Sequence, residues 1–196
     1  MNRLWHSSCS NGQGMSRSGG RTGLRRINTS KGFTLLELIF VCAVISLLAA
    51  IAVPTVFRSK LAANETSAVG TLRTVHTAQL TFTLTCGYGL YASSFPDLKD
   101  PAGDDFLPAD LTVSPTPLKS GYSYDLQPGP SGQSGLVDCN GGATSTEYYI
   151  TATPQGVGST GNRAFASNQG SVIWQDSTGV APVEPFVEIG SVSAIQ

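Results

Sequence analysis

The hydrophobic positions of this chain begin with one long run that polar residues hardly interrupt. From Phe33 to Val53 there are 21 residues, and Glu37 is their only charged side chain. As an α-helix this run would be about 31 Å long, which matches the hydrocarbon core of a membrane. A cleaved secretory signal has a shorter apolar core. The run therefore predicts a helix over residues 33–54 that stays with the protein and spans a membrane.

Beyond this run the pattern changes to that of an amphipathic helix. Pro54 lacks an N–H group and would clash with the carbonyl of Ala50, so it predicts a kink in a helix that continues over residues 55–85. The apolar stripe expected to pack on a globular domain consists of Leu61, Ala68, Leu72, Val75 and Phe82. The residues expected on the polar face are Arg58, Lys60, Asn64, Glu65 and Arg73. The helix is expected to end near Thr83 or Leu84.

Residues 86–196 carry shorter signals, which are typical of a globular head with strands and turns. The predicted strands are Gly121–Leu126, the strongly alternating Thr146–Pro154, and a hairpin of residues 163–167 and 171–176 across Asn168-Gln169-Gly170. The tail over residues 181–196 is expected to add an edge strand or to be mobile. Three to four antiparallel strands on one long N-terminal helix make the predicted fold class α+β.

The segment between the helix and the strands has no sustained period. Gly, Pro, Asp and Ser punctuate residues 88–118, so we expect a long surface connection with one helical turn. Its aromatic residues are expected to form a satellite core rather than an exposed adhesive surface. These residues are Tyr88, Tyr91, Phe95 and Phe106.

Charge divides the chain at the start of the apolar run. Residues 1–31 hold six basic residues and no acidic one, whereas the rest holds six bases and all 13 acids, a net charge of −7. A basic segment before an apolar run favours a cytoplasmic N-terminus and an exported remainder. A nucleic-acid-binding tail is disfavoured, because a membrane segment follows at once.

The residues at the start of the apolar run resemble a known sequence signal. Lys31-Gly32-Phe33-Thr34-Leu35-Leu36-Glu37 resembles the class III signal of type IV pilins and type II secretion pseudopilins. The resemblance implies that a prepilin peptidase removes a leader of residues 1–32, cutting after Gly32, and then N-methylates Phe33. It also places Pro54 at the family's helix kink, whereas Ser46 stands near the position of a glycine in many pilins. The leader would begin at Met1 or Met15.

Glu37 needs a physical explanation, because a carboxylate in hydrocarbon costs about 3 kcal/mol. Cleavage after Gly32 would create an α-amino group on Phe33, which is largely cationic and lies four residues away on the same helix face. Glu37 could pair with its own terminus or with the Phe33 amine of a neighbouring subunit. The second pairing would set the axial register of a filament. The alternative is an ordinary membrane anchor with Glu37 at the headgroup boundary.

The remaining candidate chemistry is sparse. Cys86 and Cys139 both lie in the exported part and are predicted to form a disulfide, whereas Cys9 lies in the leader and Cys42 in the membrane run. His76 is expected to be a packed or surface residue. The loop with Asp100, Asp104, Asp105 and Asp110 lacks EF-hand spacing, so a solvated loop is favoured over a calcium site. No catalytic set, metal site or cofactor is predicted.

These observations predict a type IV pilin-like structural subunit that assembles with copies of itself into a helical filament. The resemblance implies the prepilin peptidase, the inner-membrane assembly machinery and membrane lipid as further partners. The subunit would span the bacterial inner membrane before assembly and lie in an extracellular or periplasmic filament afterwards. A pseudopilin of a type II secretion system and a signal-anchored extracytoplasmic enzyme or binding domain remain alternatives.

Overall fold

The computed structural model describes residues 32–99 and 105–195. Residues 1–31 of the predicted leader, which include Cys9, lie outside the described residues, as do Asp100 and Asp104. Helix α1 (Leu35–Thr85) has 51 residues and continues through Pro54 without a break. It ends at Thr85, the last residue of the predicted range 55–85, and there the N–H groups of Cys86 and Gly87 both donate to the carbonyl of Phe82 at 2.9 and 2.7 Å. These bonds cap the last turn of the helix.

Threonines fill much of the second half of α1, although β-branched residues are weak helix formers. Their hydroxyls donate to the carbonyl four residues earlier at 2.9 to 3.1 Å, as in Thr66, Thr71, Thr74, Thr77, Thr81 and Thr85. Each hydroxyl is therefore satisfied within the helix and does not compete for another backbone conformation. The helix can thus run through a segment whose composition made its end hard to predict.

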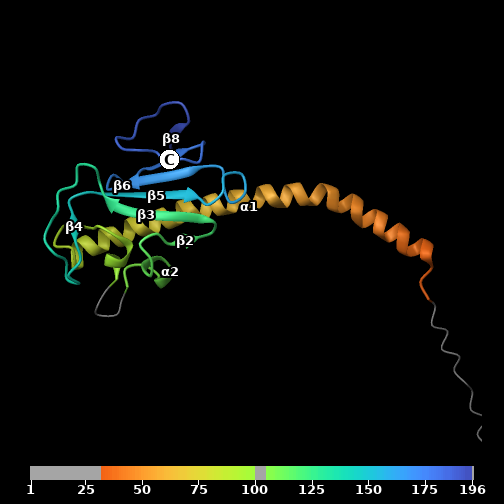
Figure 1. The fold of residues 1–196 in the computed structure, drawn as a ribbon, viewed down its shortest axis with the longest axis horizontal. Coiled ribbons are helices and arrows are strands. Elements are labelled where there is room, and N and C mark those ends of the chain that lie inside the picture. Colours follow the sequence, from red (N-terminus) through yellow and green to blue (C-terminus); the bar gives the residue numbers. More distant parts are fainter. Residues whose placement is uncertain (1–31, 100–104, 196) are drawn as a thin grey trace, which may run out of the picture. The chain divides into compact units, whose positions relative to one another are not determined.

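The head contains a six-stranded antiparallel sheet in the order β2-β3-β5-β6-β7-β8 (Figure 1). Its strands are β2 (Leu118–Lys119), β3 (Tyr122–Pro128), β5 (Tyr148–Pro154), β6 (Ala164–Asn168), β7 (Ile173–Asp176) and β8 (Val192–Ile195). A separate pair joins β1 (Tyr91–Ala92) to β4 (Thr144–Ser145). The predicted α+β fold class is confirmed, as is the β6–β7 hairpin. The predicted count of three to four strands was too low, because β1, β2 and β4 have two residues each and leave no alternating pattern.

The core lies between α1 and one face of this sheet. All five residues of the predicted apolar stripe on α1 are buried, from Leu61 at 9% exposed to Val75 and Phe82 at 0%. Alternate residues of two neighbouring strands meet them: Tyr122, Tyr124 and Leu126 on β3, and Tyr148, Ile150 and Ala152 on β5. Each large apolar side chain buried in this way contributes about 1.5–3 kcal/mol.

The segment of residues 88–118, which was expected to be a surface connection, also supplies core residues. It contains a 3₁₀ turn, η1 (Phe95–Leu98), and a short helix, α2 (Ala109–Thr112). Phe95, Leu98, Leu107 and Leu111 are all at most 1% exposed. The spacing of three puts Phe95 and Leu98 on one face of η1, whereas Leu107 lies just before α2 and Leu111 within it; these elements are too short to show a period in the sequence. Of the four aromatics assigned to a satellite core, Tyr88 is wrong, because it is 69% exposed.

Glu65 was expected on the polar face of α1, and that prediction is wrong. Only 6% of the residue is exposed. Its Oε2 accepts hydrogen bonds from Nε and Nη2 of Arg163 at 2.8 and 2.6 Å, and its Oε1 accepts from the backbone N–H groups of Asn162 and Arg163. The helical period of the apolar residues places Glu65 at the edge of the buried face. The guanidinium of Arg163, far along the chain, makes the burial of its carboxylate possible.

Two further polar side chains of α1 attach the helix to the head. The buried amide of Gln79 donates to the carbonyl of Ala92 and accepts from its N–H, at 3.0 and 2.9 Å. His76 lies between the hydroxyls of Tyr148 and Ser171, at 2.7 and 2.8 Å from its two ring nitrogens. The packed role predicted for His76 agrees with these contacts. The second half of α1 is thus held by specific bonds as well as by apolar packing.

Replacing Glu65 with alanine is expected to destabilise the head by about 2–3 kcal/mol, because it removes the carboxylate partner of the Arg163 guanidinium and the acceptor of two backbone N–H groups. Thermal or urea unfolding of the full chain in detergent would measure this loss. Glu188→Ala is the matched control, because Glu188 is exposed and accepts only one long bond, from the N–H of Ala194 at 3.5 Å. Equal stability of the two variants would contradict the role given to Glu65.

The same ion pair predicts a dependence on pH. Burial raises the pKa of Glu65, but hydrogen bonds from Asn162 and Arg163 and the guanidinium charge outweigh it and hold the pKa below its ordinary value of 4.5. The stabilisation is then complete above pH 4.5 and is lost as the pH falls through the lowered pKa. The difference in unfolding free energy between wild type and Glu65→Gln should shrink in that acid range, and a constant difference would contradict the assignment.

Candidate processing and assembly site

The start of α1 has the geometry of a capped helix. Gly32, Phe33 and Thr34 precede the helix, and all three are exposed. The Thr34 hydroxyl oxygen accepts a hydrogen bond from the N–H of Glu37 at 3.2 Å, and the Thr34 carbonyl accepts from Leu38 at 3.2 Å. Thr34 is therefore the N-cap, and Glu37 stands three residues later, as in a capping box. The Thr34-x-x-Glu37 spacing is a capping signal visible in the sequence, although the prediction gave Thr34 no role.

The bond predicted to be cut lies outside regular secondary structure. Gly32 and Phe33 come before the first helical residue, and a Cβ built on Gly32 would meet no atom within 4 Å. The described part of the chain therefore gives no steric reason for glycine at position 32.

Glu37 lies on an exposed apolar surface. Large side chains from Phe33 to Phe57 are 40% to 83% exposed, and none of the 18-residue window that qualifies α1 as a membrane span is buried. Among the described residues, the Glu37 carboxylate forms no ion pair. In this unprocessed chain the Phe33 nitrogen belongs to a peptide bond, so the proposed amine partner arises only after cleavage. An apolar surface of this extent requires lipid or protein to cover it.

Pro54 lies near the C-terminal end of this exposed surface. It cannot donate to the carbonyl of Ala50, yet the helix continues on both sides. The hydroxyl of the next residue, Thr55, donates to the carbonyls of Ile51 and Ala52 at 2.8 and 3.2 Å. Side-chain bonds of this kind support a helix at a proline. The kink assigned to Pro54 stays a prediction.

A disulfide joins Cys86, directly after α1, to Cys139 in the connection between β3 and β4. Their Cα atoms are 5.0 Å apart, and the N–H of Cys139 donates to the carbonyl of Cys86 at 3.2 Å. The cross-link spans 53 positions of the sequence and fastens the end of the helix to the head. This is the pair that the sequence predicted on the basis of an oxidising exterior.

Replacing both Cys86 and Cys139 with serine is expected to cost about 4 kcal/mol, because the unfolded chain regains the freedom of a long loop. Urea unfolding of the full chain in detergent, compared with wild type, would measure the loss. Alkylation of exported protein without reductant should leave both residues unlabelled. Full labelling of both without reductant would contradict the assignment.

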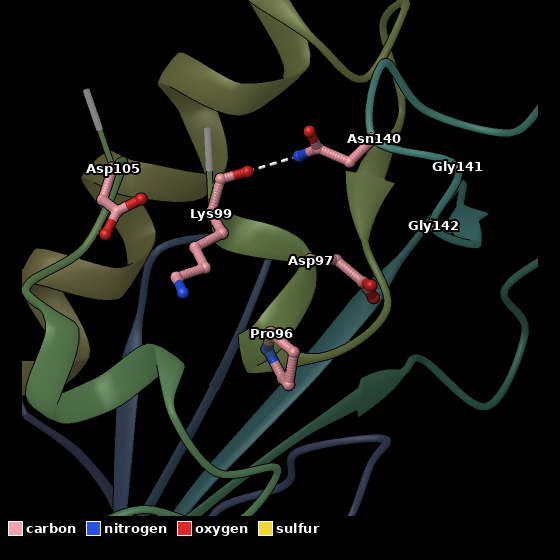
Figure 2. A pocket seen from close by; sticks show the side chains of 7 residues that line it. All are labelled: Pro96, Asp97, Lys99, Asp105, Asn140, Gly141 and Gly142. Carbon is pink, nitrogen blue, oxygen red and sulfur yellow. Dashed lines mark hydrogen bonds between the residues drawn. The ribbon is translucent and has the colours of Figure 1, made fainter. Parts of the chain in front are cut away.

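The described residues contain no cluster of three or more His, Cys, Asp or Glu side chains that could hold a metal ion. Of the acidic loop, Asp110 forms an ion pair with Lys119 at 2.9 Å, and Asp105 is exposed. An open pocket lies beside them and is lined by Pro96, Asp97, Lys99, Asp105 and the Asn140–Gly142 turn (Figure 2). Burial raises the pKa of Asp97, and the neighbouring Asp138 charge raises it further, against the hydrogen bonds from Ser94.

Comparison with known families decides how the N-terminal segment is interpreted. The model of the prokaryotic N-terminal methylation motif matches residues 27–53. This motif is the signature of type IV pilins and pseudopilins. The match contains Gly32, Phe33, Thr34 and Glu37, and it ends directly before Pro54. No curated protein and no solved structure matches the chain.

The pilin signature supports a protein that is processed at its N-terminus, and it implies a prepilin peptidase and a polymer as partners. It suggests a structural subunit rather than an enzyme. The exposed apolar part of α1 is consistent with anchoring in a membrane before assembly. The motif match stops at residue 53, so the role of the head rests on the structure alone.

Proposed function

We propose that this protein is a type IV pilin-like subunit that a prepilin peptidase processes after Gly32 and that then assembles into a helical filament at the cell envelope. The observation that carries the proposal is the methylation motif at the head of an apolar helix that is wholly exposed along its membrane-length part. Cleavage at this site leaves the helix attached to the head. The mature chain would begin at Phe33 with an N-methylated amine.

The exposed helix supports two successive environments. Before assembly its apolar side chains are covered by lipid, whose thickness the run matches. In a filament the same side chains are covered by helices of neighbouring copies. Both environments exclude water, so the Glu37 carboxylate is costly in each unless a cation meets it.

The Phe33 amine of an adjacent subunit is the proposed cation. The pairing forms only at one stagger of neighbouring helices, because any other stagger leaves a carboxylate and an amine buried without partners. Glu37 would thereby set the register of the filament. The N-cap bond from Thr34 holds the backbone at Glu37 in helical geometry, and it supports a defined position for the carboxylate.

Electron microscopy of sheared surface fibres, with mass spectrometry of their subunit, tests the proposal. We expect fibres whose subunit begins at methylated Phe33 and retains the apolar run. Processed subunits that occur only in the membrane or periplasm, with loss of protein secretion on deletion of the gene, would favour a pseudopilin. A mature N-terminus after residue 53 would overturn both assignments.

A further inference from the structure

The face of the sheet that points away from α1 carries a segment of the C-terminal tail, residues 182–186. Alternate residues of β5 are buried toward the helix, so Tyr149 points to this opposite face. The Tyr149 hydroxyl donates to the carbonyl of Pro182 at 2.6 Å. The ring of Phe186 stacks on that of Trp174 in β7 with centroids 5.4 Å apart, and it lies 6.2 Å from the ring of Tyr149. Aromatic contacts therefore hold the segment on the sheet.

A pocket of about 590 Å³ lies between this segment, the β6–β7 turn and the residues that follow β3. Its volume is in the range of sites for small ligands. Glu184 is the only charged residue that lines it, and a smaller pocket beside it is also lined by Glu184. Among the described residues, no lysine or arginine lines either pocket. The apolar part of the larger pocket consists mainly of flat rings, from Pro130, Trp174, Pro185 and Phe186.

The Glu184 carboxylate is held in place. Its Oε1 accepts a hydrogen bond from the side-chain amide of Asn168, and the Asn168 side-chain oxygen accepts one from the N–H of Gly170 at 2.9 Å. A carboxylate has about four acceptor sites, so this bond leaves it able to accept more. Within the part of the chain that the structure describes, Glu184 forms no ion pair. Gln169, which also lines the pocket, has a buried side-chain oxygen without a hydrogen-bond partner among these residues.

Negative charge dominates this face of the head. Burial, and after it the charges of Glu184 and Asp125, raises the pKa of Tyr149 to about 12. Residues 86–196 hold 11 acidic and three basic residues, so the head as a whole attracts cations. The pocket therefore combines an oriented carboxylate, flat aromatic walls and a negative surrounding potential.

We propose that this pocket binds a guanidinium cation, the side-chain group of arginine. A guanidinium is planar and weakly hydrated, so it stacks on an aromatic face such as that of Trp174 while its N–H groups donate to the Glu184 carboxylate. An ammonium group is compact and strongly hydrated, and it fits flat walls less well. The proline and phenylalanine rings suit the aliphatic stem of an arginine. This inference concerns the head and does not depend on filament assembly.

Fluorescence of Trp174 tests the site in the full chain in detergent. Trp174 is the only tryptophan outside the predicted leader, so Trp5→Phe makes it the sole reporter. Titration with N-acetyl-arginine amide should change its emission with a Kd of about 10⁻³ M, a typical value for so small a ligand. N-acetyl-citrulline amide has nearly the same shape but no charge, and it should bind about tenfold more weakly. The corresponding lysine compound should also bind more weakly than the arginine compound.

Free arginine distinguishes the two sources of the guanidinium group. The pocket has no cationic lining residue among those described to receive an α-carboxylate, so free arginine should bind no more tightly than the blocked compound. That result would favour an arginine within a polypeptide. Tighter binding of free arginine would support the same guanidinium site and assign it to the amino acid.

Glu184→Gln should weaken binding of the arginine compound about fivefold and leave the unfolding temperature of the chain unchanged. A glutamine oxygen can still accept the bond from Asn168, so the variant removes charge and keeps the contact. Glu188→Gln is the matched control, because Glu188 lies in the same tail, is exposed and does not line the pocket. Its Kd should equal that of wild type.

Three results would overturn the proposal. Equal Kd values for the arginine and citrulline compounds would show that the pocket does not recognise charge. Binding to Glu184→Gln as tight as to wild type would place the cation elsewhere. The absence of any saturable change, by fluorescence and by calorimetric titration, up to about tenfold above the expected Kd would show that the pocket does not bind the group.

Discussion

Cells that express only Glu37→Ala are expected to yield at least tenfold fewer sheared filaments than wild type, while the amount of processed subunit in the membrane is unchanged or higher. The substitution removes the carboxylate but leaves the Phe33 amine, which the filament would then bury without its partner. Loss of one member of a buried ion pair costs about 3–5 kcal/mol, which is enough to prevent addition of a subunit.

Insertion of the Glu37→Ala monomer into the membrane should be unimpaired or improved, in contrast to filament assembly. A carboxylate in hydrocarbon costs about 3 kcal/mol, so the variant monomer should enter the membrane at least as well as wild type. Cleavage after Gly32 should also persist, because the substitution lies outside the scissile bond and keeps the N–H that Thr34 caps. Glu37→Gln should behave like Glu37→Ala, because the amide lacks the charge.

Glu188→Ala is the control for loss of a carboxylate, because Glu188 is an exposed residue of the head. Its filament yield should equal that of wild type. A normal filament yield from Glu37→Ala, expressed alone, would reduce Glu37 to a boundary residue of an anchor. Loss of the processed subunit from the membrane fraction would instead show a defect before assembly.

Gly32→Val is expected to block processing almost completely, so that the subunit keeps its leader. The valine side chain would crowd the scissile bond in the peptidase. The described residues leave open space around Gly32, so the substitution should leave the fold of the chain intact. Mass spectrometry of the membrane-bound subunit would distinguish the precursor from a chain that begins at Phe33.

Gly70→Val provides a matched control for this substitution. Gly70 is exposed on α1, and a Cβ built there likewise meets nothing within 4 Å. That variant should be cut and methylated like wild type, and valine has a slightly higher helix propensity than glycine. Efficient cutting of Gly32→Val would show that the peptidase does not select glycine at this position or that the site is elsewhere.

The features of the N-terminal half could be predicted from the order of neighbouring residues alone. A run of 21 residues with one charge identifies a membrane-length helix, and the Gly32–Glu37 pattern identifies the processing signal, because both depend only on neighbouring residues. The helical period likewise identified the buried stripe from Leu61 to Phe82, since residues three and four apart share a face.

Tertiary structure decided which polar residues of that helix meet the head. Glu65 lies four residues after Leu61 and three before Ala68, so the period places it beside the buried stripe, but its partner Arg163 lies 98 positions later and no local pattern could reveal that pairing. The same holds for Gln79, whose amide bonds to the backbone of Ala92 in a strand of two residues. Short elements carry too few residues to display a period.

The proximity of the Asp97 and Asp138 carboxylates, which both lie beside Gly142, has the same origin. From the sequence, the acids close together in the loop around Asp104 were the obvious candidates. The two carboxylates that meet, Asp97 and Asp138, are 41 positions apart, and Asp138 lies next to Cys139 in the loop that the disulfide fastens to the end of α1. Sequence reports the chemistry that neighbouring residues share. Contacts between distant residues arise only when the packing of the core fixes where their loops lie. The free energy of that packing comes from residues all over the head, so no short stretch of sequence contains it.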